Sequence, residues 1–141
     1  MSEPNVQQAV PFLRVTDMEA SLRFYVDGLG FEMKKSWTPE GKIRWCWLEL
    51  GAAPMMLQTF LTEGPHRNVP ETKLGLGVSI NFVCSDALSI YRDVKSRGID
   101  AKRPFVGNAM WVTQVTDPDG YELYFESPTD VPEETEISEA R

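Results

Sequence analysis

The sequence predicts an α+β fold in which two tandem βαβββ modules form a cupped mixed sheet with the helices on its convex side. Two observations carry this prediction. The chain of 141 residues repeats the order strand, helix and three strands. The two copies also align at an offset of 68 residues, which places Leu29-Gly30-Phe31 opposite Arg97-Gly98-Ile99 and Asp17 opposite Ser85. Helix caps and helix ends therefore match together.

We expect a single domain over 1–141, because this length suits one domain and a half of about 60 residues would bury too little surface to be stable alone. Its parts are module one at 9–61, a linker at 62–73, module two at 74–127 and an acidic C-terminal tail at 128–141.

In module one, the first strand is expected at 9–16, and Asp17 is placed to cap a helix that Gly28 and Gly30 end. The helical spacing i, i+3, i+4, i+7 is occupied by Leu22, Tyr25, Val26 and Leu29. Turn residues then separate three strand-like runs at 31–37, 42–50 and 54–61.

In module two, a strand is expected at 77–84, followed by a helix that Ser85 caps and Gly98 ends. The apolar stripe of this helix is Ala87, Ile90, Tyr91 and Val94. The remaining strands are expected at 105–106, 109–116 and 121–126. The Asp117-Pro118-Asp119-Gly120 segment reads as a turn rather than a catalytic motif, because proline presets φ and glycine accepts a positive φ.

Charge is concentrated at the C-terminus. Of the formal net charge of −7, the last fifteen residues carry −4, from Asp130, Glu133, Glu134, Glu136 and Glu139 against Arg141. Pro128 and Pro132 predict a solvated, frayed end, and a partner-binding segment is the alternative. The body has no cluster of Lys and Arg, which argues against a nucleic-acid partner.

No apolar run approaches the roughly 18 residues that span a bilayer, so we expect a cytoplasmic protein without a membrane partner. Cys46 and Cys84 lie in strand-like runs, where reduced thiols are expected. The only histidine, His66, falls in the polar linker and is expected to be solvated rather than a ligand or base. No nucleophile elbow or phosphate-binding glycine loop is present.

The concave face of such a sheet makes a cleft, and strand alternation assigns residues to it. Trp45 and Trp47 face away from the core, which predicts a ligand wall, a subunit interface or packing under a loop. In the last strand, Glu122, Tyr124 and Glu126 share the face opposite Leu123 and Phe125. In the run at 54–61, periodicity does not decide which of two sets faces the cleft: Met56, Gln58 and Phe60, or Met55, Leu57 and Thr59. The position of Trp111 is compatible with either structural packing or ligand contact.

Several motifs together resemble the vicinal oxygen chelate superfamily. Leu13-Arg14-Val15-Thr16-Asp17-Met18, Phe24-Tyr25 and Leu29-Gly30-Phe31 are similar to its first module, and Asp117-Pro118-Asp119-Gly120-Tyr121 is similar to the end of its second. The superfamily includes glyoxalase I, extradiol dioxygenases, methylmalonyl-CoA epimerase, fosfomycin-modifying enzymes and the non-enzymatic bleomycin resistance proteins. An acidic chain, aromatic residues beside the cleft and a Trp before the final turn resemble the bleomycin resistance branch most.

The resemblance also implies where a metal would bind in this chain. The positions that match the metal ligands of the superfamily hold Val10, Gln58, Ser79 and Tyr124. Val10 cannot ligate and the others are poor ligands for divalent metals. We therefore expect no metal and no cofactor.

The resemblance thus implies a metal-free homodimer with grooves between its subunits, which sequesters a drug or another aromatic, amphipathic or cationic small molecule. The expected ligand-binding residues are Trp45, Trp47, Met56, Gln58, Phe60, Asn81, Trp111, Tyr124 and Glu126. One alternative is an enzyme, glyoxalase-, epimerase- or dioxygenase-like, with a non-standard site in which Glu122, Tyr124 or Glu126 acts as acid or base. Another is a regulatory module that binds a partner through the acidic tail.

Overall fold

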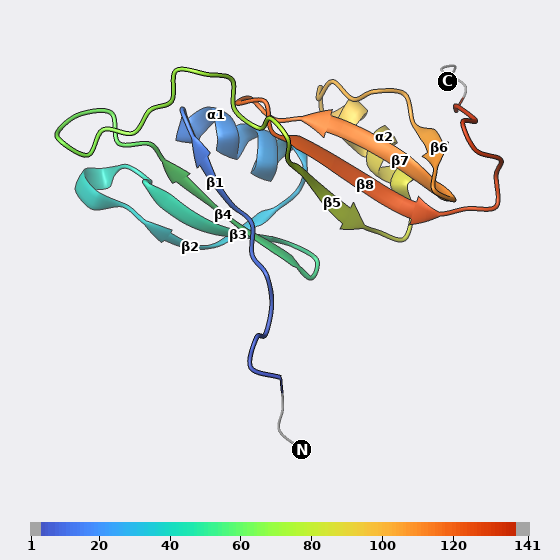
Figure 1. Cartoon of the computed structure of the whole chain (residues 1–141), viewed down its shortest axis with the longest axis horizontal. Coiled ribbons are helices and arrows are strands. Elements are labelled where there is room, and N and C mark those ends of the chain that lie inside the picture. Colours follow the sequence, from blue (N-terminus) through green and yellow to red (C-terminus); the bar gives the residue numbers. More distant parts are fainter. Residues whose placement is uncertain (1–3, 138–141) are drawn as a thin grey trace.

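The computed structural model describes residues 4–137 and contains two four-stranded mixed sheets, with strand orders β1-β4-β3-β2 and β5-β8-β7-β6 (Figure 1). The strands of the first sheet are β1 (Phe12–Val15), β2 (Glu32–Trp37), β3 (Trp45–Leu50) and β4 (Ala53–Thr59). Those of the second sheet are β5 (Ser79–Val83), β6 (Phe105–Gly107), β7 (Met110–Thr116) and β8 (Glu122–Pro128). In each sheet the first strand of the module runs parallel to the last. The expected α+β fold and the repeated strand order are confirmed.

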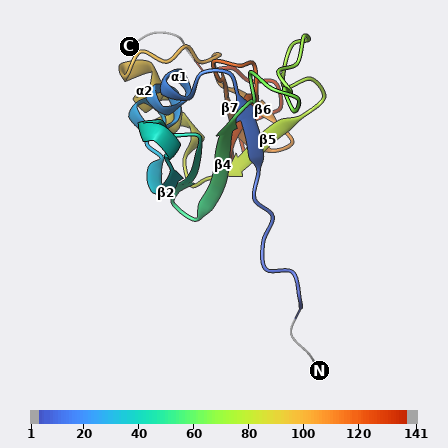
Figure 2. The ribbon, with the colours of Figure 1, turned by 90° about the vertical axis from the view of Figure 1, so that its left-hand side faces the viewer.

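The helical elements are α1 (Met18–Leu22), the π-helical segment η1 (Arg23–Gly28), the 3-10 turn η2 (Pro39–Gly41) and α2 (Ala87–Ser96). Figure 2 shows α1 and α2 on the same side of the two sheets. The opposite faces of both sheets are therefore left without helices, as a cupped arrangement requires. No helix between residues 4 and 137 combines the length and the apolar character that a membrane crossing needs.

The helical segments of the two modules start alike but differ in length by one residue, because α1 (5 residues) and η1 (6 residues) together are one residue longer than α2 (10 residues). Asp17 caps α1, and Asp86, rather than the expected Ser85, caps α2 by accepting the backbone N–H groups of Leu88 and Ser89, both at 3.1 Å. Each helix is followed by a glycine with positive φ, so cap and glycine are thirteen residues apart in module one and twelve in module two. The extra residue is accommodated in η1, because a π-helix is an α-helix widened by one residue.

The two modules share one hydrophobic core. Aromatic rings continue from module one into module two, with centroids 5.7 Å apart for Tyr25 and Phe31, 6.0 Å for Phe31 and Phe82, and 4.9 Å for Phe82 and Phe125. All three distances are within the ordinary range for aromatic pairs. The modules are therefore packed as one body rather than joined only by the linker.

The turn before β8 links the two modules through a buried hydrogen bond. The hydroxyl of Tyr25 donates to the buried carboxylate of Asp117 at 2.7 Å, and the same carboxylate accepts the backbone N–H groups of Asp119 and Tyr121 at 2.9 Å. Burial raises the pKa of Asp117, and it raises the pKa of Tyr25 so far that the phenol stays a hydrogen-bond donor. The expected turn is present, and its first aspartate also bridges to the helical segment of module one.

The acidic tail differs from expectation, because its described part is docked against β6. The backbone of Val106 accepts from Glu134 at 2.8 Å and donates to Thr135 at 2.9 Å. The carboxylate of Glu133 accepts the N–H groups of Asn108 and Ala109, at 3.0 and 2.8 Å. The open edge of β6 and these two turn amides supply partners that a sequence pattern does not reveal. Residues 138–141 of the tail lie outside the described part.

The linker has no regular structure, as expected, but part of it is closed into a loop. The backbone N–H of Leu61 donates to the Asn68 side chain at 2.6 Å, and the N–H of Asn68 donates to the carbonyl of Leu61 at 2.9 Å. His66 lies inside this loop and is exposed to solvent.

Candidate binding surface

Strand alternation, confirmed by burial, defines which side chains lie on the helix-free side of the first sheet. In β3, Cys46 and Leu48 are fully buried under the helix, so Trp45 and Trp47 face the other way. In β4, Met55 and Leu57 are fully buried. The structure thereby resolves the choice that periodicity left open, and it places Met56 and Gln58 beside the two tryptophans.

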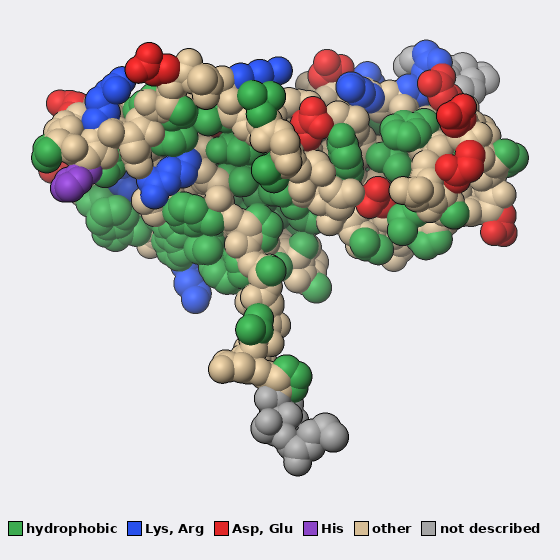
Figure 3. All heavy atoms as spheres, viewed as in Figure 1, with side chains coloured by type: hydrophobic (Ala, Val, Ile, Leu, Met, Phe, Trp, Pro, Cys, Tyr) green, Lys and Arg blue, Asp and Glu red, His purple; other side chains and the backbone are tan. Residues whose placement is uncertain are grey.

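Five large side chains form a continuous apolar surface there, which we call the aromatic face: Phe12, Trp37, Trp45, Trp47 and Met56. Met56 lies between Phe12 and Trp47 in the strand register, and Trp37 is paired with Trp45. Trp37 is 58% exposed and Phe12 41% exposed. Figure 3 shows hydrophobic side chains gathered over β2, β3 and β4. Such large exposed rings are typical of a surface that binds something.

Sequence analysis missed Phe12 and Trp37. Phe12 alternates with the buried Leu13, so period two could have assigned it to this face. Trp37 could not be assigned, because β2 contains an irregularity between Met33 and Lys35 that shifts its alternation.

The aromatic face carries two cations and one fixed indole. The guanidinium of Arg14 lies 5.6 Å from the centre of the Phe12 ring, and the ammonium of Lys35 lies 5.5 Å from that of Trp47. The indole N–H of Trp47 donates to the carboxylate of Glu49 at 2.8 Å. These contacts hold the rings in place, which reduces the entropy that a stacking ligand has to overcome.

The helix-free face of the second sheet is polar and acidic. Glu122, Tyr124 and Glu126 lie on it, with Leu123 and Phe125 buried on the other side as expected. The Tyr124 hydroxyl donates to Glu122 at 3.0 Å, and the Asn81 amide donates to Glu126 at 3.2 Å. The hydrogen bond to Glu122 is the main reason that the pKa of Tyr124 is raised. We call this surface the acidic face.

Two expected ligand-binding residues do not lie on either of these faces. Trp111 pairs with Val106 and Ser127, and it shares a face of β7 with Thr113, whose hydroxyl donates to the backbone of helix α2 at 2.8 Å. Because β7 begins at Met110, side chains alternate regularly at Trp111, and Trp111 therefore points to the helix side. Phe60 follows the end of β4 and is 9% exposed beside α1, where it lines a separate pocket. The structure therefore separates both residues from Tyr124 and Glu126, which lie on the helix-free face of the second sheet.

The positions that correspond to metal ligands in the superfamily carry side chains that are poorly suited to a divalent metal. The Val10 side chain has no donor atom, the hydroxyl of Ser79 donates to Asn81 at 3.0 Å, and the hydroxyl of Tyr124 donates to Glu122 at 3.0 Å. Among residues 4–137, no group of three or more His, Cys, Asp or Glu could hold a metal ion. The residues present do not fit a divalent metal.

The thiols offer no nucleophile. Cys46 and Cys84 are both free, and burial raises the pKa of Cys46 to about 11 and also raises that of Cys84. Both remain protonated at neutral pH, so neither is activated for covalent catalysis.

Fold and surface together define a protein of two βαβββ modules whose helix-free sheet faces are one aromatic and one acidic. A family model described as "Glyoxalase/Bleomycin resistance protein/Dioxygenase superfamily" matches residues 6–125. The chain belongs to this superfamily. No match was found among curated protein sequences.

Solved structures similar to this chain have the same fold. TnmS3, an antibiotic binding protein from Streptomyces sp. CB03234, superimposes with a TM-score of 0.64 at 17% identity, over 90% of this chain and 100% of that one. A putative glyoxalase family protein from Bacillus anthracis gives 0.63 at 17% identity, with the same shares covered. A glyoxalase/bleomycin resistance protein/dioxygenase from Nocardioides gives 0.65 at 17% identity, over 96% of this chain and 93% of that one.

Proposed function

We propose that this protein binds a small aromatic or amphipathic molecule and holds it without chemical change. The observation that carries the proposal is the aromatic face, where three tryptophans, a phenylalanine and a methionine lie together outside the core. Aromatic rings provide a large contact area with few rotamers to freeze, so they suit the binding of flat ligands. The similarity to an antibiotic binding protein is consistent with this class of ligand.

The acidic face supports a ligand that also carries a positive charge. Glu122 and Glu126 attract a cation, and Tyr124 between them offers a hydroxyl. A molecule with a planar body and a cationic group would use both kinds of surface.

The proposal includes a homodimer in which the aromatic face of one copy lies opposite the acidic face of the other. Arg14 and Lys35 would then meet Glu122 and Glu126, so the two surfaces are complementary in charge. Burying Trp37 and Phe12 in this way would also remove most of the exposed aromatic area. The cytoplasm remains the expected compartment.

Sedimentation at micromolar concentration tests the dimer. We expect about twice the chain mass of 16.0 kDa. A species of single-chain mass over the whole concentration range would contradict the dimer.

Binding without turnover is tested by incubating the protein with planar cationic compounds and recovering the ligand. Quenching of tryptophan fluorescence should saturate at a stoichiometric ratio, and mass spectrometry should return the ligand unchanged. A product that accumulates beyond one equivalent per chain would instead support the enzymatic alternative.

Elemental analysis tests the metal-free part of the proposal. Protein purified without chelator should hold far less than one divalent metal per chain, because Val10, Gln58, Ser79 and Tyr124 occupy the ligand positions of the superfamily. Stoichiometric Ni, Zn, Fe or Mn that survives dialysis would contradict it.

A further inference from the structure

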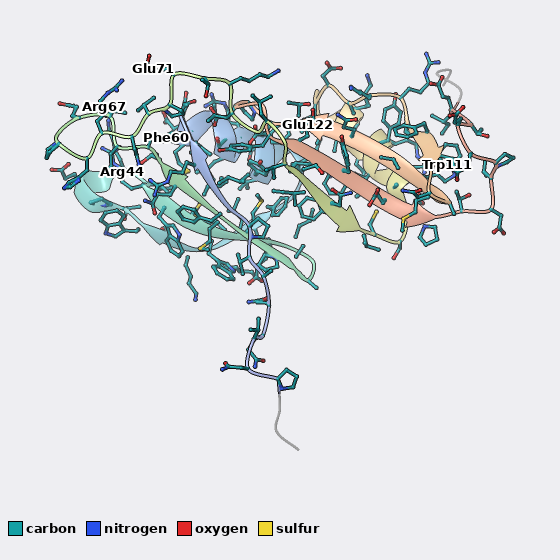
Figure 4. The ribbon with its side chains drawn as sticks, in the orientation of Figure 1. Arg44, Phe60, Arg67, Glu71, Trp111 and Glu122 are labelled. Atoms are coloured by element: carbon teal, nitrogen blue, oxygen red, sulfur yellow. The ribbon has the colours of Figure 1, made fainter. Side chains whose placement is uncertain are left out.

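A pocket of about 570 Å³ lies on the helix side of the first sheet, at the opposite surface from the aromatic face. Its walls come from the first turn of α1, from residues 41–44 before β3, from the end of β4 and from Val69 of the linker. Figure 4 shows Arg44 and Phe60 at this end of the sheet, where the linker with Arg67 and Glu71 passes over it. A volume in this range suits a small ligand.

The pocket exists because one short helix cannot cover four strands. A helix with its side chains is about 10 Å wide, whereas four strands spaced about 4.8 Å apart are wider. The helix α1 packs near β4 and leaves the approach to β3 uncovered. Met18, 7% exposed, and Phe60, 9% exposed, form an apolar floor there.

Hydrogen bonds within the protein hold each wall in position. Asp17 accepts from the backbone of Ala20 at 3.1 Å at the start of α1. The backbone of Arg44 donates to Trp37 at 2.9 Å and accepts from Thr59 at 3.0 Å. The closed loop between Leu61 and Asn68 supports the segment that carries Val69. A pocket built this way needs little ordering when a ligand enters.

Two basic residues line the pocket without ion pairs. Lys42 lies at the exposed rim and Arg44 is partly buried. The ion pairs within residues 4–137 are Lys34 with Glu32 and Arg103 with Glu136, so neither lining residue belongs to one. Two acids, Asp17 and Glu19, also line the pocket, and the Asp17 carboxylate already accepts a hydrogen bond from the backbone of α1 as its N-cap.

We propose that this pocket is a second ligand site that binds a small amphipathic anion, independent of the proposed function on the sheet faces. The apolar part would lie on Met18 and Phe60, and the anionic group would be bound by Arg44 and Lys42. An arginine beside a carboxylate makes a charge-assisted hydrogen bond that is stronger in a partly dehydrated position than in open water.

Calorimetric titration of the full chain with decanoate tests the site. Wild type should bind one decanoate per chain, and Arg44→Gln should weaken binding about tenfold because the charge-assisted bond is lost. Thr59→Phe, which places a ring in the pocket, should abolish binding. Arg92→Gln is the matched control, because it removes an exposed cation from helix α2, outside the pocket lining, and should change decanoate affinity less than twofold.

The charge of the probe gives a second readout. Decyltrimethylammonium has the same alkyl chain with a cationic group, and its binding should be insensitive to both pocket variants. If Arg92→Gln weakens decanoate binding as much as Arg44→Gln does, or if Arg44→Gln has no effect, the proposal of a second site is wrong. These outcomes leave ligand binding on the aromatic face unaffected, so the two proposals fail separately. Should Thr59→Phe not fold, Arg44→Gln still decides the question.

Discussion

Replacing Asp117 with alanine should lower the free energy of unfolding by about 3 kcal/mol, since a buried donor left without a partner costs about 1 to 3 kcal/mol and two part-buried donors lose their acceptor as well. Three donors lose their acceptor together: the hydroxyl of Tyr25 and the backbone N–H groups of Asp119 and Tyr121. The first of these bonds joins the two modules, so its loss affects the shared core as well as the turn.

Urea denaturation of wild type and variant measures this effect. Asp119→Ala is the matched control, because Asp119 accepts the backbone N–H of Thr16 at 3.1 Å and also the Thr16 hydroxyl in exposed positions, where water can replace the carboxylate. Its expected cost is about 1 kcal/mol or less. Equal losses for the two variants would show that the buried bridge is unimportant.

The Asp117 carboxylate also makes the free energy of unfolding depend on pH. Burial raises the pKa of Asp117 above the ordinary 3.8, so the folded chain holds this proton more tightly than the unfolded chain. The resulting stabilisation is present at a pH below the pKa of Asp117 in the unfolded chain, and it is lost as the pH rises through the pKa in the folded chain. Asp117→Asn cannot titrate. The free energy of unfolding of Asp117→Asn relative to that of wild type should therefore increase from about pH 4 toward neutrality. Urea titrations of both proteins over that range measure the difference.

Trp47→Ala should weaken a ligand that binds the aromatic face by at least about tenfold, because truncation of a well-packed aromatic anchor commonly costs about 2 kcal/mol. Trp47 is the best-fixed ring of the face, held by Lys35 on one side and Glu49 on the other. Glu126→Gln should weaken cationic ligands selectively and reduce their salt dependence.

Trp111→Ala is the control for this experiment. Both substitutions remove one tryptophan, but Trp111 points to the helix side of the second sheet, so ligand affinity should change less than twofold. Fluorescence titration of variants whose dimer is intact provides the measurement. A ligand that loses affinity with Trp111→Ala and keeps it with Trp47→Ala would place the binding surface elsewhere.

Local patterns were sufficient for much of this structure. Alternation assigned Trp45 and Trp47 to the helix-free side, and it did the same for Tyr124 between Glu122 and Glu126, because each neighbouring position is strongly apolar and becomes buried. The turn at Asp117 and the glycines after both helices were also evident, since their backbone conformations depend on a few adjacent residues.

The tertiary structure decided what depends on distant partners. The two faces of β4 have similar composition, so only packing against α1 shows that Met55 and Leu57 are buried. Trp111 was assigned by the register of β7 with β8, and the tail was positioned by the free edge of β6. The sequence alone therefore determined the repeated fold and the helix-free orientation of Trp45, Trp47 and Tyr124. Strand register, sheet edges and the uncovered end of the first sheet required the folded chain, because hydrogen bonds between residues far apart in sequence select among local conformations of similar energy.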